Sequence, residues 1–308
     1  MLKPPAVEPD ARVAVIAPAS SSKPERLARG IEALRARGYD AEFGQYAQER
    51  QAPYFSGTAE QRLADLHAAF ADPEVRSIFC TRGGYGSNYL LEDIDLDLIR
   101  DNPKPLFGYS DMTAVQTWLL DELGLISFHG PMVAADFAVD DGVHEASFHA
   151  ALDGDAVAVG AMEGLRVLRP GRAQGVMYGG CLSILTASLG TRFAPQTEGK
   201  LLFLEDVAAK PYQIDRMLRQ MVLGGKLDGV TGFVFGEMLE CTSPGTAPEL
   251  LEQVILRVLD WFDGPIAIGL RSGHVSHSNV TLPFGIEAEL ILEDQPVLRY
   301  LEPAVQVD

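Results

Sequence analysis

Three segments of the sequence carry a hydroxyl, a carboxylate and an imidazole, the groups that a serine hydrolase combines. Ser110 follows the apolar stretch 105–109, Glu205 follows the apolar stretch 201–204, and His274 lies on a glycine-flanked loop. A serine hydroxyl is a weak nucleophile until an imidazole accepts its proton and an acid orients that imidazole. The order serine, acid, histidine along the chain is one that working triads use. The sequence therefore predicts Ser110 as nucleophile, Glu205 as orienting acid and His274 as general base.

The segment around Ser110 is typical of a strand, a tight turn and a helix. The hydroxyl would project above the carboxyl edge of a sheet, where ligands bind in open α/β folds. The amide of Asp111, at a helix N-terminus, would face the same space and suit an oxyanion. Two observations favour a plain helix N-cap instead: serine and aspartate are common caps, and Met112 replaces the second glycine of GxSxG.

A glycine-rich segment, TRGGYGSN at 81–88, follows the stretch 75–80. Its glycines let a backbone approach a ligand closely and present free amides. Neither GxxxxGK[ST] nor GxGxxG is present, which disfavours a nucleotide-phosphate loop. An oxyanion loop that works with the amide of Asp111 fits better, and a simple strand-to-helix turn is the alternative.

The acid and the base also have structural alternatives. Glu205 or Asp206 would serve equally well as a cap of the following helix or as a partner of Arg216. His274 and His277 are three residues apart, a spacing that two metal ligands can have. No third ligand accompanies them at a convincing spacing, so we expect no metal. His129 would line the same site or be a satisfied structural histidine.

Alternating strand and helix patterns position the serine half of this chemistry. Such βα units predict a parallel sheet that helices cover on both faces. Thr58 and Gln61 have the spacing of a capping box at the start of one helix. The expected strands are 12–18, 75–80, 105–109 and 125–129, and the expected helices are 25–38, 58–71 and 113–123.

The second half is richer in strands, which glycine and proline turns separate. We expect strands at 164–168, 172–178, 200–204, 230–235, 266–269, 288–292 and 297–301, with helices at 182–189, 214–223 and 248–262. The sequence thus predicts two α/β domains, a parallel-sheet domain at 1–155 and a β-rich domain at 165–308. The boundary would lie near 153–169.

Composition limits the classes of function. The 308 residues carry a formal net charge of -18, which disfavours nucleic-acid binding. No apolar run approaches the roughly 18 residues of a membrane span, and the N-terminus lacks a signal-peptide pattern, so we expect a cytoplasmic location. The cysteines form no CxxC pair and are expected to be reduced and mostly buried: Cys80, Cys181 and Cys241.

The segments together resemble a known family, and the resemblance spans nearly the whole chain. The chain is similar to the L,D-carboxypeptidases of murein recycling, serine peptidases whose relatives include the microcin C immunity hydrolases. The matching pieces, in the family's order, are VAVIAPAS, FSGTAEQRLADLHAAFADPEVRSIFCTRGGYGSNYLL, KPLFGYSDMTAV, SFHGPM, LLFLEDV with PYQIDRML, and GHVSHSNVTLPFG.

The resemblance implies a fold and a site. It implies a flavodoxin-like N-terminal domain, a β-rich C-terminal domain, an active site between them, a homodimer, and neither metal nor organic cofactor. The family's serine, acid and histidine fall on Ser110, Glu205 and His274. Its oxyanion donors would be the amides of Asp111 and of Gly83 or Gly84, which would also contact the substrate.

The implied activity is release of the C-terminal D-alanine from cytoplasmic murein tetrapeptides through an acyl-enzyme. Rivals are a microcin C-type hydrolase of aminoacyl-nucleotide amides, an α/β-hydrolase esterase and a non-catalytic ligand-binding protein. The microcin relatives tend to use an aromatic partner for a base, and Trp118 and Trp261 fall in expected helices. Cys181 stands where the family often has asparagine, and Ala208-Ala209 where it often has Gly-Glu. Arg82 and Arg271 are candidates for binding the D-alanine carboxylate.

Overall fold

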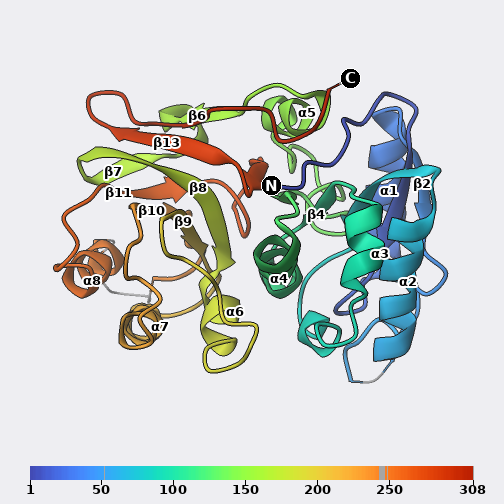
Figure 1. Cartoon of the computed structure of the whole chain (residues 1–308), viewed down its shortest axis with the longest axis horizontal. Helices are drawn as coiled ribbons and strands as arrows, with labels where there is room; N and C mark the ends of the chain where they lie inside the picture. Colours follow the sequence, from blue (N-terminus) through green and yellow to red (C-terminus); the bar gives the residue numbers. More distant parts are fainter. Residues whose placement is uncertain (52, 243–246, 248, 308) are drawn as a thin grey trace.

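The computed structural model describes residues 1–51, 53–242, 247 and 249–307. Two sheets lie side by side (Figure 1). The first contains β1 (Arg12–Ile16), β2 (Asp40–Phe43), β3 (Val75–Cys80), β4 (Leu106–Gly108), β5 (Ser127–His129) and β12 (Leu282–Phe284). Its order is β2-β1-β3-β4-β5-β12, parallel from β2 to β5, with β12 antiparallel. This is the flavodoxin-like order of strands, and it confirms the parallel α/β prediction.

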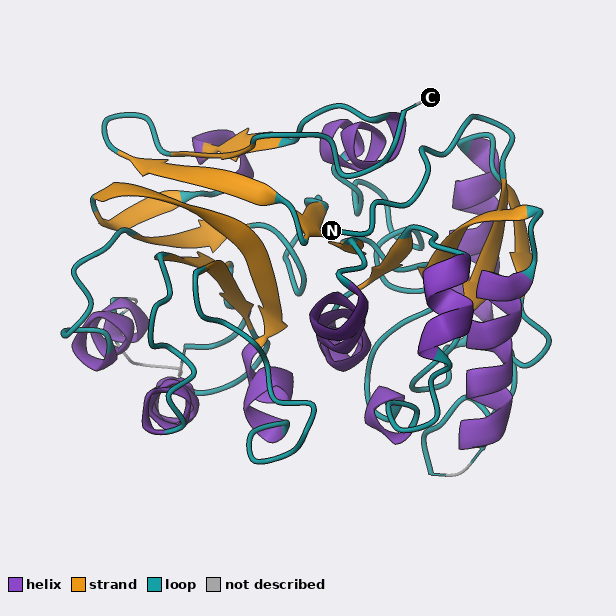
Figure 2. Ribbon diagram, viewed as in Figure 1, coloured by secondary structure: helices purple, strands orange, loops and turns teal. Residues whose placement is uncertain are grey.

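Helices cover both faces of this sheet, as expected. They are α1 (Pro24–Ala36), α2 (Ala59–Ala71), α3 (Leu96–Asp101), α4 (Thr113–Leu123) and α5 (Glu145–Asp153). Successive strand residues face opposite sides. Val15 therefore lies in one buried cluster with Leu34 of α1, and Ile16 lies in the other with Phe70 of α2. Figure 2 shows these helices, in purple, packed around the smaller sheet.

The second sheet has eight described strands: β6 (Ala158–Gly160), β7 (Arg166–Arg169), β8 (Gly171–Cys181), β9 (Lys200–Glu205), β10 (Gly232–Gly236), β11 (Ile266–Leu270), β13 (Glu287–Leu292) and β14 (Val297–Tyr300). Its order is β6-β14-β13-β8-β9-β10-β11-β7. Strands β8 to β11 are mutually parallel, and the other neighbours are antiparallel. Helices α6 (Leu182–Ala187), α7 (Pro211–Leu223) and α8 (Leu250–Val258) lie below the sheet in Figure 1.

The strand-rich second half is thus confirmed, and the division near residue 155 stays a prediction. Strand β12 comes from the second half of the chain yet completes the first sheet by pairing with β5. Strand β8 contacts both β12 and α4, the helix that follows β4, at the seam between the sheets.

Local predictions differ from the structure mainly at element ends. The capping box at the start of α2 is present: Gln61 N donates to Thr58 Oγ1 at 3.2 Å and Thr58 N to Gln61 Oε1 at 2.8 Å. Pro248, in the predicted helix 248–262, lies outside the described residues, and α8 ends before Trp261. The elements β2, α3, α5, β6 and β12 were not predicted, because three- to nine-residue elements carry little periodicity.

None of the helices described here has the length and apolarity needed to cross a membrane.

Candidate active site

Ser110 occupies the sharp turn between β4 and α4. Its φ is 62°, in the left-handed region that residues other than glycine rarely adopt. A short 3₁₀ turn, Ser110–Met112, leads directly into α4. The strained turn holds the hydroxyl at the carboxyl edge of the first sheet, and such strain is concentrated at functional positions.

Gly83 packs directly against this turn. A Cβ atom placed on Gly83 would lie 2.7 Å from Ser110 Cβ, 2.9 Å from Ser110 Oγ and 3.0 Å from Asp111 N. Only glycine leaves this space open. A small oxygen atom can therefore approach the serine hydroxyl and the amide of Asp111 together, which is the requirement for an oxyanion site. Gly84 follows at φ +100°, where glycine is favoured.

The side chain of Asp111 joins the glycine loop to the serine turn. Ser87 N donates to Asp111 Oδ2 at 2.7 Å, and Ser87 Oγ donates to the backbone oxygen of Asp111 at 2.7 Å. Arg62, also buried, holds the loop from the other side by donating to the carbonyl of Gly86 at 2.7 Å. Sequence reasoning considered only the amide of Asp111 and missed Arg62, which no motif singles out.

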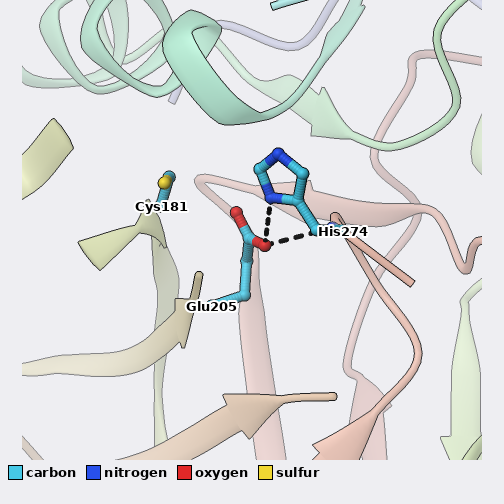
Figure 3. A group of neighbouring side chains, drawn as sticks. All are labelled: Cys181, Glu205 and His274. Carbon is cyan, nitrogen blue, oxygen red and sulfur yellow. Dashed lines mark hydrogen bonds and ion pairs between the residues drawn. The ribbon is translucent and has the colours of Figure 1, made fainter. Parts of the chain in front are cut away.

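Glu205 and His274 form a closely coupled pair. Glu205 is the last residue of β9 and is fully buried. Its Oε2 lies 2.7 Å from His274 Nδ1 and 3.0 Å from His274 N (Figure 3). Burial would raise the pKa of Glu205, but the charge and hydrogen bonds of His274 outweigh it and lower that pKa. Burial would likewise lower the pKa of His274, but Glu205 raises it above its usual value.

Glycines allow this close approach. A Cβ on Gly273 would lie 2.7 Å from Glu205 Cδ and 2.8 Å from His129 Cε1, and the φ of Gly273 is +90°. A Cβ on Gly236, at the end of β10, would lie 2.7 Å from Glu205 Cβ. The carboxylate thus fits between β8, β10 and the histidine loop only because two of its neighbours lack side chains.

A buried polar network fixes the histidine loop. Asn279 Oδ1 accepts from Gly273 N at 3.0 Å, and Asn279 Nδ2 donates to Asp136 Oδ1 at 3.1 Å. Asp136 Oδ2 in turn accepts from Met132 N at 2.8 Å. Burial raises the pKa of Asp136 to about 6, although these hydrogen bonds oppose the shift. Asn279 belongs to the segment GHVSHSNVTLPFG, but the sequence assigned it no role. No sequence signal pointed to Asp136.

Ser110 and His274 line one pocket of about 360 Å³. It opens beyond the carboxyl ends of β1, β3, β4 and β5, the edge where ligands bind in such folds. No hydrogen bond joins Ser110 to His274 among the described residues. The other lining residues are Ser22, Lys23, Arg26, Arg82, Gly83, Gly84, Tyr109, Met132, Ala134 and Ala135.

The other histidines named from the sequence do not line this pocket. His277 is exposed, and its Nδ1 lies 2.9 Å from Ser276 Oγ. His129 is fully buried, with Nδ1 3.1 Å from Ser272 Oγ and Nε2 without a hydrogen-bond partner in the described part of the chain. Burial lowers the pKa of His129 to about 4, so its ring is neutral at pH 7. His129 is therefore a core residue in which only one of the two ring nitrogens has a described hydrogen-bond partner.

Three other positions differ from expectation. Asp206 Oδ2 accepts from Ser183 N at 2.9 Å and so caps α6, which precedes it in the chain, instead of the following helix. Arg216 lies over the ring of Tyr212 and pairs with no acid among the residues that the structure describes. Arg271 donates to the carbonyl of Met162 at 2.7 Å and is absent from the pocket that Arg82 lines.

Cys181 places a thiol beside the acid–imidazole pair. It lies opposite Glu205 in the register of β8 and β9, and its Sγ, a Glu205 oxygen and a His274 nitrogen lie within 4.8 Å of one another. In Figure 3 the second Glu205 oxygen points toward the side of Cys181. The thiol is therefore a second candidate nucleophile. Burial raises its pKa well above the usual value, and the charges of Glu205 and Asp206 raise it further, which keeps it protonated.

Comparison with known protein families gives two matches that together cover most of the chain. The LD-carboxypeptidase N-terminal domain matches residues 13–130, and the LD-carboxypeptidase C-terminal domain matches residues 174–290. The chain belongs to the LD-carboxypeptidase family. This membership confirms the predicted family and the predicted class of enzyme, a serine-type carboxypeptidase.

Individual members of the LD-carboxypeptidase family are similar over almost their whole length. A probable murein peptide carboxypeptidase of Bacillus subtilis (strain 168) is 39% identical over 94% of this chain and 91% of its own. The murein tetrapeptide carboxypeptidase of Pseudomonas aeruginosa PAO1 is 30% identical over 91% of this chain and 93% of its own. The crystal structure of an MccF-like protein from Bacillus anthracis strain Ames superposes with a TM-score of 0.89 at 27% identity, covering 97% of this chain and 99% of that one.

The two family matches divide the candidate site between them. Ser110 and the glycine loop lie in the part matched by the LD-carboxypeptidase N-terminal domain, whereas Glu205 and His274 lie in the part matched by the C-terminal domain. Each half alone therefore carries an incomplete set of groups, and the pocket contains residues of both.

Proposed function

We propose that this protein is a serine carboxypeptidase that releases the C-terminal D-alanine of murein tetrapeptides in the cytoplasm, for cell-wall recycling. The proposal depends on one observation above all. Ser110, in a strained turn, and His274, held by a buried carboxylate, line a single pocket. The murein peptides named for similar proteins supply the substrate class.

The proposed reaction begins with attack by Ser110 Oγ on the carbonyl carbon between the diamino acid and D-alanine. His274 takes the hydroxyl proton through Nε2, since Glu205 occupies Nδ1. The amides of Asp111 and Gly83 stabilise the negatively charged carbonyl oxygen. The C–N bond then breaks, His274 gives its proton to the leaving amine, and D-alanine departs.

Water completes the cycle. His274 removes a proton from the water molecule, the hydroxide attacks the ester carbonyl, and Ser110 regains its proton as the tripeptide acid leaves. Hydrogen bonds between catalytic groups often shorten only when substrate binds. We therefore propose that Ser110 and His274 move closer together when substrate binds.

We also propose that the protein is a homodimer. Light scattering of the purified protein would test this.

The decisive experiment is mass spectrometry of the wild type and Ser110→Ala incubated with mixed muropeptides. We expect the wild type to shorten tetrapeptides by one alanine and Ser110→Ala to lose activity by several orders of magnitude. Ser276→Ala is the matched control, because this serine is exposed on the histidine loop outside the pocket. Undiminished release of D-alanine by Ser110→Ala would end the proposal.

A second candidate, hydrolysis of aminoacyl-nucleotide amides as in microcin C immunity, rests on a neighbouring pocket of about 410 Å³. Aromatic rings of Tyr85, Tyr89 and Phe193 line it and offer stacking surfaces for a base. Its charged lining residues, Glu92 and Asp111, are acidic, which disfavours a nucleotide phosphate. We therefore expect muropeptides to be cleaved faster than aminoacyl-nucleotide amides when both are assayed side by side.

A further inference from the structure

The pocket that contains Ser110 is positively charged, although the chain as a whole carries -18. Lys23, Arg26 and Arg82 line it, and no aspartate or glutamate does so within the described residues. We call these three residues the cationic wall. A pocket whose permanent charges are all of one sign favours a ligand group of the opposite sign.

The fold brings the cationic wall together from two loops. Lys23 immediately precedes α1, which follows β1, and Arg26 lies in the first turn of that helix. Arg82 lies on the glycine loop after β3. Strands β1 and β3 are neighbours, and the strand order reverses at this point of the sheet. Such a switch point forms a crevice in open α/β folds, and here Ser110 lies at the same edge.

Hydrogen bonds to uncharged groups orient the side chain of Arg26, and its positive charge has no acidic partner among the described residues. Its Nε donates to the carbonyl of Ala134 at 2.7 Å and its Nη2 to that of Ala135 at 2.9 Å. Both acceptors are uncharged, and Nη1 makes no hydrogen bond to a described residue. Neither Lys23 nor Arg82 forms an ion pair or a side-chain hydrogen bond within the described parts of the chain. The cationic wall is thus uncompensated.

Arginines elsewhere on the surface behave differently. Several of them pair with acids, as Arg12 does with Glu42, Arg172 with Glu293 and Arg299 with Glu289. What sets the cationic wall apart is that three cations line one pocket with Ser110 and no described acid lines it with them, on a strongly acidic chain, which favours an anionic ligand group.

We propose that the cationic wall binds the C-terminal carboxylate of the substrate peptide, with Arg26 and Arg82 as its main partners. This inference rests on the proposed function, because it takes Ser110 as the nucleophile. The terminal carboxylate of the leaving residue is only three bonds from the carbonyl carbon that Ser110 would attack. A guanidinium that lines the same pocket is therefore within its reach, and its planar fork suits a carboxylate.

The consequence is specificity for the last residue of a chain. A free terminal carboxylate forms ion pairs with the cationic wall, whereas the neutral carbonyl of an amidated or extended peptide at this place accepts only weaker hydrogen bonds. The sequence had offered Arg82 and Arg271 as alternatives for this role. The structure excludes Arg271 from the pocket and adds Arg26, a helix residue that no motif singled out.

The test compares kcat/KM for L-Ala-D-Glu-L-Lys-D-Ala with that for its C-terminal amide. Lysine at the third position removes the second carboxylate that diaminopimelate would supply. We expect the wild type to favour the acid by about 10- to 100-fold, the range of a hydrogen bond to a charged group. In Arg82→Gln and Arg26→Gln the rate on the acid should fall by a similar factor, and the preference for acid over amide should nearly vanish.

Arg29→Gln is the matched control. Arg29 lies on the same helix as Arg26, is exposed, and approaches Asp140 at 3.7 Å outside the pocket. It should keep both rates. Arg26→Lys, which retains the charge, should restore part of the preference. If Arg26→Gln does not fold, Arg82→Gln and Lys23→Gln carry the test, because both side chains are exposed.

Equal rates of the wild type on acid and amide would overturn the inference, as would equal losses on both substrates in the arginine variants. If the arginine substitutions lowered kcat/KM only for peptides that contain diaminopimelate, the cationic wall would bind the side-chain carboxylate of that residue. That result would also overturn the inference. Failure of the proposed function would appear separately, as no D-alanine release by the wild type. Calorimetry with Ser110→Ala then still decides: tighter binding of the acid than of the amide supports the inference, and equal affinity overturns it.

Discussion

Two nitrogens of His274, Nδ1 and the backbone N, lie within hydrogen-bond distance of a single oxygen of Glu205, Oε2, at 2.7 and 3.0 Å. An ionised carboxylate only accepts, so Nδ1 carries the proton in this pair. The other ring nitrogen, Nε2, is then the one available as a base. The backbone bond fixes the loop and the ring bond fixes the tautomer, so one buried carboxylate controls both position and chemistry.

The first prediction concerns pH. Burial alone would lower the pKa of His274, but Glu205 raises it above the ordinary 6.5. A general base must be neutral, so kcat/KM should rise with pH through a midpoint above 6.5. Glu205→Gln removes the largest stabilising charge while burial remains, so the midpoint should move down and kcat should fall about 10²- to 10⁴-fold. The pH profile of kcat/KM measures both effects.

The control for this profile is His277→Ala. The exposed imidazole of His277 lies outside the pocket, so its removal should leave the midpoint unchanged. A midpoint that disappears in His277→Ala but persists in His274→Ala would show that the wrong histidine was assigned as base.

The second prediction tests the oxyanion space. Gly83→Ala would place a methyl group 2.9 Å from Ser110 Oγ and 3.0 Å from Asp111 N. We expect kcat to fall about 10²- to 10³-fold, as on loss of an oxyanion donor. Gly224→Ala is the control, since its nearest neighbour would be 3.3 Å away, at the far end of α7. Full activity of a correctly folded Gly83→Ala enzyme would contradict an oxyanion at this position.

The third prediction separates serine from thiol chemistry. Burial and neighbouring carboxylates keep Cys181 protonated, so iodoacetamide at pH 7 should not inactivate the enzyme. Cys181→Ala should retain activity to within about tenfold of the wild type, since the triad is intact. D-alanine release before and after alkylation measures this. Loss of activity in Cys181→Ala together with survival in Ser110→Ala would identify the thiol as nucleophile.

The fourth prediction concerns the network beneath the histidine loop. Asp136 is buried, and it accepts hydrogen bonds from Met132 N and Asn279 Nδ2. Asp136→Asn would turn a donor toward one of them, which should lower the free energy of unfolding by about 1–3 kcal/mol at pH 7. Urea unfolding measures this change. Asp140→Asn, on an exposed side chain, should change stability by less than about 0.5 kcal/mol. Equal stability of both variants would mean that the network does not hold the loop.

Much of the fold was predictable because its signals are local. Long periodic segments such as α2, α4 and β3 were located closely from their apolar pattern. Short strands such as β12 were missed, since three residues that pair with a strand more than 150 positions earlier carry no local signature. The same limit applied to Asp136, whose role depends on Asn279 far along the chain.

The sequence by itself determined which groups are available: a serine after one apolar strand, a carboxylate after another, a histidine directly after a glycine, and a glycine loop. Side-chain type and the local pattern of apolar residues are properties of short segments, so they can be read without coordinates. The tertiary structure alone decided how closely His274 meets Glu205, that Gly83 opens the space beside Ser110, and that Arg26 joins Arg82 around it. These outcomes depend on the order and register of strands and on the fit of neighbouring backbones, which arise only when distant parts of the chain pack together.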